Sequence, residues 1–178
     1  MTKKVLLITS NFGVEHDELK KPLDFLKSKG IEVIHVAIEL KDVQTVIHDS
    51  EKSATYTPDV ILEKVDLKDY DLLLIPGGTV NADQLRIDEN VKKTIQYFAD
   101  NKKVIAAICH APWVLINAER IKNKKLTSYK SIRLDIENAG GKWVDEQVHR
   151  CNTDEWILIT SRNPDDISAF NEAILKEF

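Results

Sequence analysis

A cysteine and a histidine stand side by side where a strongly apolar segment meets the expected start of a helix. The run Val104–Ile108 is unbroken and apolar, which is typical of a strand buried on both faces at the centre of a parallel sheet. Cys109 and His110 follow, and Pro112 suits the first turn of a helix, where its missing N–H costs no hydrogen bond. This order predicts a nucleophile elbow that lifts the Cys109 side chain above the sheet.

The chemistry expected of Cys109 is that of a nucleophilic thiol. The N–H groups of a helix N-terminus favour the thiolate over the thiol, and so does a neighbouring His110 when it is protonated. The alternative is a structural role, because a lone cysteine is among the residues most often buried. The stretch alone supports the two interpretations equally.

Three further loops are expected at the same edge of the sheet, because each follows a predicted strand. They are Glu15-His16-Asp17-Glu18, Gly77-Gly78 and Ser161-Arg162-Asn163-Pro164. Ligands of open parallel sheets bind at the carboxyl ends of the strands, so we expect these loops to meet Cys109. A carboxylate from the first loop would hydrogen-bond the thiol and move protons, and N–H groups near Gly78 and His110 would stabilise an oxyanion. Taken singly, each loop is also explained as a capped helix start or a tight turn.

Strands and helices alternate along the chain. Strands are predicted at residues 5–9, 31–38, 43–47, 60–65, 72–75, 104–108, 126–129 and 156–160, and helices at 17–29, 90–101, 112–118, 131–139 and 165–174. Pro22 should kink the first helix or delay its start, while residues 10–13 indicate a turn and 49–54 a surface loop. The alternation predicts an α/β protein, a three-layer α/β/α sandwich around a flavodoxin-like, mostly parallel sheet. We expect a single domain over residues 1–178.

Composition limits the partners and the compartment. The 178 residues are 43% hydrophobic with a formal net charge of −4, so there is no basic surface for nucleic acid and no apolar run of membrane-spanning length. The N-terminus looks like a first strand rather than a secretion signal. Two cysteines without motif spacing indicate a reducing compartment, which predicts a cytoplasmic protein. Neither a metal site nor a cofactor is expected, because ligand spacings and phosphate-binding glycine loops are missing from the sequence.

Three segments together resemble one known family. Ala107-Ile-Cys-His-Ala-Pro112, with Leu74-Ile-Pro-Gly-Gly78 upstream and Thr160-Ser-Arg-Asn-Pro-Asp-Asp166 downstream, is similar to the ThiJ/PfpI family of the class I glutamine amidotransferase-like superfamily. The segments occur in the family's order and with similar spacing over nearly the whole chain. The last segment, followed by Phe170-Asn171, resembles the bacterial PfpI-like branch.

The resemblance implies a role for each matching residue. Cys109 is implied to be the nucleophile and Glu18 the carboxyl group that meets it. His110 is implied to form a triad with an acid from a neighbouring subunit, as in PfpI-like proteins, and the matching acid is Asp83. The N–H groups of Gly78 and His110 are implied to form the oxyanion hole. An acid supplied by a second subunit implies a homodimer or a homohexamer.

The sequence also departs from the family pattern. Ala111 stands where glycine is usual, and Trp113 stands where glutamine is common, so a bulky indole is expected to narrow the pocket. Residues 11–15 differ from the usual first loop, and residues 45–49 keep only a remnant of a Gly-Lys-His-Gly signal. Glu15 and His16 join Trp113 as expected pocket residues.

Several isolated residues have ordinary explanations. His16 is alternatively a surface-loop histidine, and His35 is predicted to be a satisfied histidine of the core or sheet edge. Cys151 lies in a polar stretch and is interpreted as incidental. Trp143 and Trp156 fall in strand-like segments and are predicted to be core residues.

Three functions remain open. The first, which we favour, is an enzyme of the glyoxalase III or deglycase type, in which the Cys109 thiolate adds to the aldehyde of methylglyoxal and Glu18 moves a proton on the way to lactate. The second is an intracellular cysteine peptidase that uses Cys109, His110 and Asp83 on peptides. The third is a non-enzymatic stress-response chaperone or redox sensor in which Cys109 is oxidised to a sulfinic acid beside Glu18.

Overall fold

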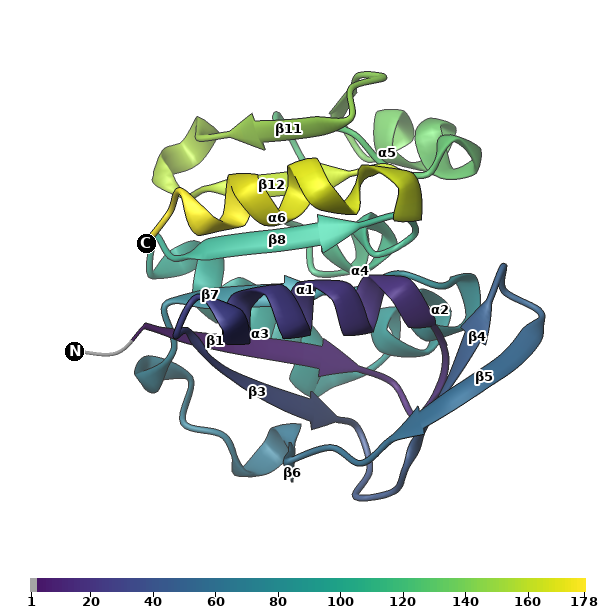
Figure 1. The fold of residues 1–178 in the computed structure, drawn as a ribbon. Helices are drawn as coiled ribbons and strands as arrows, with labels where there is room; N and C mark the ends of the chain where they lie inside the picture. The colour runs from purple at the N-terminus through teal and green to yellow at the C-terminus, as the bar shows by residue number, and fades with distance from the viewer. Residues whose placement is uncertain (1–2) are drawn as a thin grey trace.

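The middle layer of the molecule is a seven-stranded sheet, seen in the computed structural model, which describes residues 3–178 (Figure 1). The strand order is β11-β12-β8-β7-β1-β3-β6, and β11 alone pairs antiparallel with its neighbour. The strands are β1 (Lys4–Thr9), β3 (Glu32–Ala37), β6 (Val60–Ile61), β7 (Leu72–Ile75), β8 (Val104–Ile108), β11 (Val148–Cys151) and β12 (Leu158–Ser161). The parallel strands therefore share one carboxyl edge, where the predicted site should lie.

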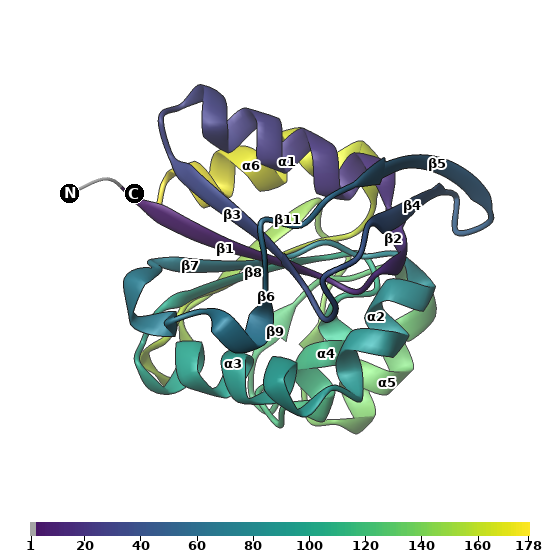
Figure 2. The ribbon, with the colours of Figure 1, turned by 90° about the horizontal axis from the view of Figure 1, so that it is seen from below.

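Helices cover both faces of this sheet. Figure 2 shows α1 (His16–Ser28) and α6 (Ile167–Leu175) on one face, and α2 (Thr79–Arg86), α3 (Glu89–Asp100), α4 (Pro112–Asn117) and α5 (Arg133–Asn138) on the other. The predicted three-layer α/β/α sandwich is confirmed. Short 3₁₀ turns lie at Leu62–Lys64, Leu67–Asp69, Lys130–Ile132, Thr153–Glu155 and Pro164–Asp166. Within residues 3–178, none of the helices combines the length and apolarity that a membrane span requires.

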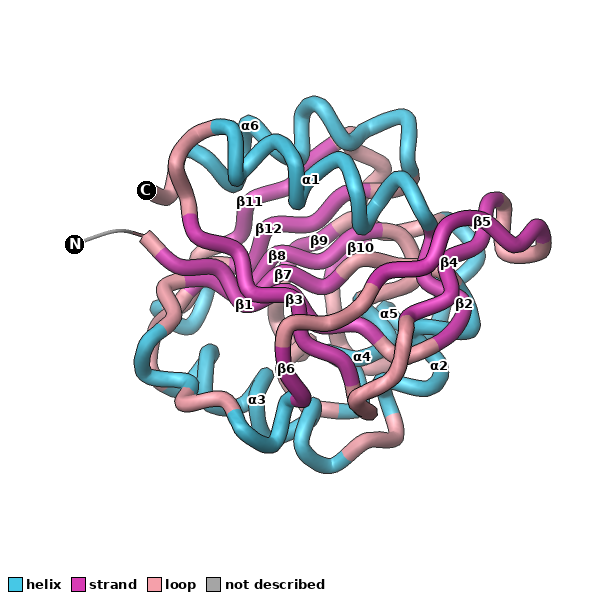
Figure 3. Tube along the Cα trace, turned by 60° about the horizontal axis from the view of Figure 1, so that its bottom comes forward, coloured by secondary structure: helices cyan, strands magenta, loops and turns pink. Residues whose placement is uncertain are grey.

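Two small sheets flank the main one. β2 (Phe12–Glu15), β4 (Val43–Ile47) and β5 (Glu51–Tyr56) form a three-stranded sheet, and β9 (Lys125–Leu126) pairs with β10 (Lys142–Trp143). Figure 3 shows the β4–β5 hairpin projecting beyond the main sheet, close to β2 and α2. This hairpin approaches the carboxyl edge of the parallel strands and so contributes to the site described below.

The core is divided by the pleat of the strands, because successive side chains point to opposite faces. On β1, Leu6 and Ile8 pack into the cluster that contains Phe98 of α3, whereas Val5 and Leu7 pack with Phe170 of α6. All six are fully buried, and each contributes about 1.5–3 kcal/mol by leaving water. Burial on both faces explains why these strands appear in the sequence as unbroken apolar runs.

Several element predictions were wrong in detail. The predicted turn at 10–13 includes part of β2, and the predicted surface loop at 49–54 is mostly β5, which pairs with β4. The predicted strands at 60–65 and 126–129 are only two residues long, ending at Ile61 and Leu126. These segments pair at the periphery, where strands are short and half exposed, so their sequences lack a clear period.

Helix predictions needed three corrections. α1 begins at His16 and contains Pro22, so the proline does not delay the helix; it only deprives the Glu18 carbonyl of its usual donor. α2 was not predicted, and residues 131–139 are split between a 3₁₀ turn and α5.

Trp156 is buried as predicted, whereas Trp143 is only half-buried. His35 is buried with its Nε2 2.8 Å from the Thr9 hydroxyl, which confirms a satisfied core histidine.

Candidate active site

Cys109 occupies a sharp turn between β8 and α4. Its φ of +63° lies in the left-handed region, which costs a residue with a side chain about 1–2 kcal/mol. The surrounding backbone holds it there: the Cys109 N–H donates to the Ser161 carbonyl at 3.1 Å, and the Tyr129 N–H donates to the Cys109 carbonyl at 2.8 Å. The geometry is that of a nucleophile elbow, with the thiol at the carboxyl edge of the sheet.

Glu18 reaches the thiol from the first turn of α1 across Gly77. The Glu18 side chain is fully buried, and its Oε2 accepts the Gly77 N–H at 2.8 Å. A Cβ at position 77 would lie 2.5 Å from Glu18 Oε2 and 2.6 Å from Cys109 Cβ. A glycine is therefore required between the acid and the thiol. Glu18 Oε1 has no hydrogen-bond partner among the described residues.

Burial decides the protonation of this pair. Burial raises the pKa of Glu18 to about 8, helped by the negative charge of Glu15 and opposed by the Gly77 N–H. Burial, and then the charge of Glu18, raise the pKa of Cys109 well above its usual value, although the N–H groups of Gly78 and His110 lower it. Burial thus opposes the thiolate that the helix N-terminus and a protonated His110 favour, so the bias toward the thiolate stays a prediction. With a pKa of about 8, Glu18 is largely protonated at neutral pH, and burial favours the thiol form of Cys109.

His110 stands beside the thiol and is held on two sides. Its Nδ1 lies 3.2 Å from Cys109 Sγ, and its Nε2 lies 3.2 Å from Ser131 Oγ. Its ring stacks on Tyr129 with a centroid distance of 4.8 Å. Burial lowers the pKa of His110, so the ring is neutral. The tautomer that fits both contacts donates from Nε2 to Ser131 and leaves the Nδ1 lone pair toward the thiol, where it can accept the thiol proton.

Asp49, at the tip of the β4–β5 hairpin, approaches His110 through Thr79. The Thr79 N–H and hydroxyl donate to Asp49 at 2.7 and 2.9 Å. The same Thr79 oxygen lies 3.5 Å from His110 Nδ1 and 3.4 Å from Nε2. Because it is almost equidistant from both nitrogens, it contacts the ring between them. The charge of Asp49 raises the pKa of His110 against the effect of burial, so it favours the imidazolium that forms when the thiol is deprotonated.

The hairpin tip is itself held by Glu15. The N–H groups of His48 and Asp49 donate to the two Glu15 carboxylate oxygens at 3.3 and 3.4 Å. Both donors have left-handed backbone angles, with φ of 52° and 62°, a conformation that non-glycine residues rarely adopt. Burial raises the pKa of Glu15, while these two N–H groups lower it. Glu15 thus positions the hairpin over Cys109.

These side chains surround a small cavity of about 150 Å³. Its lining residues come from four loops at the carboxyl edge and from the hairpin: Glu15, Glu18, His48, Asp49, Cys109, His110, Tyr129 and Pro164. Four of these, Glu15, Glu18, Cys109 and His110, were predicted from the sequence to share a site. The backbone N–H groups of Gly78 and His110, for which an oxyanion hole was predicted, lower the pKa of the Cys109 thiol; the oxyanion hole itself stays a prediction.

Two of the predicted pocket residues, His16 and Trp113, do not line the cavity. His16 bonds Asp17 at 3.1 Å and the Tyr56 hydroxyl at 3.0 Å, which fits its alternative interpretation as a half-buried surface residue. Trp113 donates to Asp135 at 2.7 Å, and its ring packs 5.3 Å from that of His110. The indole therefore does not narrow the Cys109 cavity.

Asp83 is also outside the cavity within its own subunit. Its side chain on α2 is 70% exposed and lies 3.9 Å from Arg86. The predicted contact between Asp83 and the His110 of a neighbouring subunit is a contact between copies, so it stays a prediction.

Sequence reasoning missed Asp49, Thr79, Tyr129 and Ser131. Thr79 directly follows the Gly77-Gly78 pair, and Tyr129 ends a predicted strand; both positions therefore carried the signal of a loop at the carboxyl edge. Asp49 carried only the remnant signal of residues 45–49, because its approach to His110 depends on how the hairpin folds. Among residues 3–178, no three His, Cys, Asp or Glu side chains cluster in a way that could hold a metal ion.

Comparisons with known proteins agree on one family. Residues 3–177 match the model of the DJ-1/PfpI family. General stress protein 18 of Bacillus subtilis is 39% identical over 98% of this chain and 97% of its own length. Protein/nucleic acid deglycase 2 of Escherichia coli is 36% identical over 99% of this chain and 98% of its own. The crystal structure of Drosophila melanogaster DJ-1beta superimposes with a TM-score of 0.88 at 29% identity, covering 99% of this chain and 90% of that one.

Proposed function

Because this chain belongs to the DJ-1/PfpI family, we propose that it is a stress-response enzyme whose Cys109 attacks small reactive carbonyl compounds. The observation that carries this proposal is the buried pair of Cys109 and Glu18. Gly77 lies between them, and any side chain at that position would clash with both. The pKa of Glu18 is raised to about 8, so the acid can give up and recover a proton near neutral pH. The relative named as a deglycase supports the same class of substrate.

The first step is addition of the thiol to an aldehyde such as that of methylglyoxal. His110 Nδ1, 3.2 Å from Sγ, takes the thiol proton while the sulfur forms a bond to the aldehyde carbon. The N–H groups of Gly78 and His110 stabilise the negative oxygen. Glu18, which begins as the acid, donates its proton to that oxygen and becomes a carboxylate. The product of this step is a neutral hemithioacetal on Cys109.

The second step moves a proton between the two carbons of the substrate. The Glu18 carboxylate takes the proton from the former aldehyde carbon, giving an enediolate. Glu18 then returns this proton to the neighbouring carbon while the proton of the first hydroxyl moves to the second oxygen, which leaves a thioester on Cys109. Water hydrolyses the thioester to lactate and the thiolate; the thiolate recovers its proton from His110, and Glu18 takes one of the two protons that hydrolysis releases. The net reaction is methylglyoxal plus water giving lactate and a proton, with no external oxidant or reductant.

The size of the cavity supports a small substrate. About 150 Å³ accommodates a three-carbon dicarbonyl but not an extended peptide backbone. The charges of Glu15 and Asp49 at its rim also favour a neutral molecule at the thiol itself. Both features favour the carbonyl enzyme over the peptidase.

A cysteine peptidase is the second candidate, and the Cys109–His110 contact favours it. An imidazole 3.2 Å from a thiol and held by Ser131 on its other side resembles the nucleophile, base and orienting group of a triad. In this alternative Asp83 of a neighbouring subunit completes the triad, which requires a homodimer or homohexamer.

The proposal is tested by turnover of methylglyoxal without glutathione. We expect freshly reduced wild-type protein to form lactate and Cys109→Ser to lose this activity. Cys151→Ser is the matched control, because Cys151 is also buried and free but lies outside the cavity. Absence of turnover in reduced wild type would contradict the proposal, and cleavage of peptide substrates by the same preparation would then favour the peptidase.

A further inference from the structure

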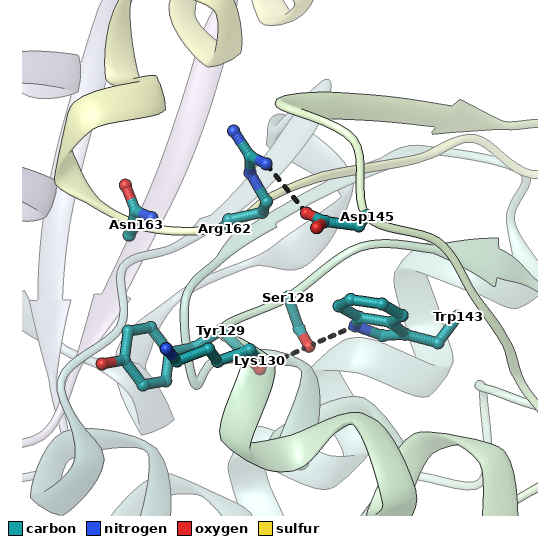
Figure 4. A pocket seen from close by; sticks show the side chains of 7 residues that line it. All are labelled: Ser128, Tyr129, Lys130, Trp143, Asp145, Arg162 and Asn163. Carbon is teal, nitrogen blue, oxygen red and sulfur yellow. Dashed lines mark hydrogen bonds and ion pairs between the residues drawn. The ribbon is translucent and has the colours of Figure 1, made fainter.

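A second and larger cavity opens beside the Cys109 cavity (Figure 4). Its volume is about 340 Å³, and we call it the Trp143 pocket because the indole of Trp143 forms one of its walls. It is lined by Ser128, Tyr129, Lys130, Trp143, Asp145, Arg162 and Asn163. None of the roles assigned above, apart from the stacking of Tyr129 on His110, uses these side chains.

The two cavities share a wall. Tyr129 lines both of them, and Asn163 of the Trp143 pocket is followed directly by Pro164 of the Cys109 cavity. In Figure 4, Tyr129 and Asn163 lie on the side of the pocket opposite Trp143. The two cavities therefore lie next to each other, with Tyr129 and the Asn163–Pro164 segment between them.

The apolar wall of the pocket is rigid. The Trp143 indole N–H donates to Ser128 Oγ at 3.0 Å, and the Arg133 guanidinium lies over the indole ring, 5.2 Å from its centroid. The indole is thus held from its edge and from one face. A fixed wall of this kind lowers the entropic cost of binding a ligand.

The charged groups of the pocket favour an anion. The Lys130 ammonium group has neither an ion pair nor a hydrogen bond within residues 3–178, so it is a free donor. Arg162 is anchored by the buried Asp166, which accepts at 2.8 and 3.1 Å. The second partner of Arg162 is Asp145 at 2.8 Å, whose side chain is 67% exposed. An exposed ion pair of this kind is weak, so a ligand carboxylate can replace Asp145 on Arg162.

We propose that the Trp143 pocket is a second substrate subsite that binds a carboxylate. Lys130 and the outer edge of Arg162 hold the carboxylate, and the apolar chain that joins it to the carbonyl lies against Trp143 and Tyr129. The inference rests on the proposed function, because it assigns the natural substrate to carbonyl compounds longer than methylglyoxal with an anionic end. A guanidinium and an ammonium group together suit this planar anion.

The test uses alkylation of Cys109 and does not depend on turnover, so it can fail or succeed independently of the proposed function. Three probes share one reactive group: N-iodoacetylglycine is anionic, its amide is neutral, and N-iodoacetyl-ethylenediamine is cationic. Rates at Cys109, followed by peptide mass spectrometry, are divided by the rates with free cysteine. Glu15 and Asp49 repel an anion at the thiol, so a faster anionic probe in the wild type indicates an attractive subsite beyond it.

Two variants should change the anion preference in opposite directions. Lys130→Gln should lower the ratio of anionic to neutral rates by about two- to fivefold, the range of a partly exposed charge pair. Asp145→Asn should raise it, because Arg162 loses its competing partner. Lys29→Gln is the charge-matched control, since Lys29 follows the far end of α1 and should leave the ratio unchanged.

The outcomes separate clearly. A wild-type preference for the anionic probe that falls in Lys130→Gln and rises in Asp145→Asn supports the carboxylate subsite. Equal normalised rates for the three probes, or a ratio that both variants leave unchanged, would overturn it. A preference for the cationic probe would show that the negative charge of Asp145 dominates the pocket, and it would also overturn the proposal.

Discussion

At the scale of single residues, the site depends on Gly77, which leaves room for Glu18 to meet Cys109. We predict that Gly77→Ala lowers methylglyoxal turnover strongly and destabilises the protein by about 1–3 kcal/mol, the usual cost of overpacking. The reason is that its Cβ would lie 2.5 Å from Glu18 Oε2 and 2.8 Å from the Ile108 carbonyl. Denaturant unfolding and steady-state kinetics measure the two effects.

Gly30→Ala provides the control for this prediction. Gly30 has a φ of +75° but nothing within 4 Å of its Cβ position, so alanine there adds only backbone strain of about 1–2 kcal/mol. We expect turnover to survive in this variant. Equal loss of activity in both variants would show that the space at position 77 is not what matters.

Glu18 should also make stability depend on pH. Its pKa rises from 4.5 in the unfolded chain to about 8 in the folded one, so the folded state binds the proton more tightly. The contribution of Glu18 to the free energy of unfolding is complete below about pH 4.5 and is lost as the pH rises through about 8. We predict that the wild type loses up to about 4 kcal/mol across this window relative to Glu18→Gln. Urea unfolding of both proteins from pH 5 to 9 measures the difference, and parallel pH profiles would contradict it.

At the scale of elements, the β4–β5 hairpin brings Asp49 to the site. We predict that Asp49→Asn lowers the pKa of His110, because the carboxylate charge that raises it is removed. The loss of this partly screened charge should lower kcat/KM about two- to fivefold. NMR titration of the His110 ring protons measures the effect, and Thr79→Val tests whether the Thr79 hydroxyl takes part in it. An unchanged pKa in Asp49→Asn would show that the Asp49 carboxylate only fastens the hairpin to Thr79.

The central strands β7 and β8 could be predicted from the sequence, whereas β5 of the hairpin could not. β7 and β8 are buried on both faces, so their apolar runs identified the sheet and placed Cys109 and Gly78 at its carboxyl edge. β5 buries none of its six residues fully, so no apolar period marked it as a strand. Asp49 was missed for that reason. The raised pKa of Cys109 was also missed, because it depends on burial of the thiol and on the charge of Glu18 rather than on local sequence.

At the scale of the whole molecule, the open question is assembly. Asp83 is exposed on α2 and does not line the cavity of its own subunit, so its side chain is available to a neighbouring copy. We predict a homodimer or homohexamer in sedimentation experiments. If the triad forms between subunits, mixing Cys109→Ser with Asp83→Asn subunits should restore peptidase activity that neither variant has alone. Activity that stays absent after verified subunit exchange would contradict a shared triad.

The central claim is that Cys109 adds to the carbonyl and Glu18 moves the proton, and the most direct measurement is methylglyoxal turnover by Glu18→Gln. Loss of a positioned acid–base group costs about 10²–10⁴-fold. We predict that kcat falls within this range while mass spectrometry still detects the methylglyoxal adduct on Cys109. A Glu18→Gln protein that forms lactate at the wild-type rate would contradict the account.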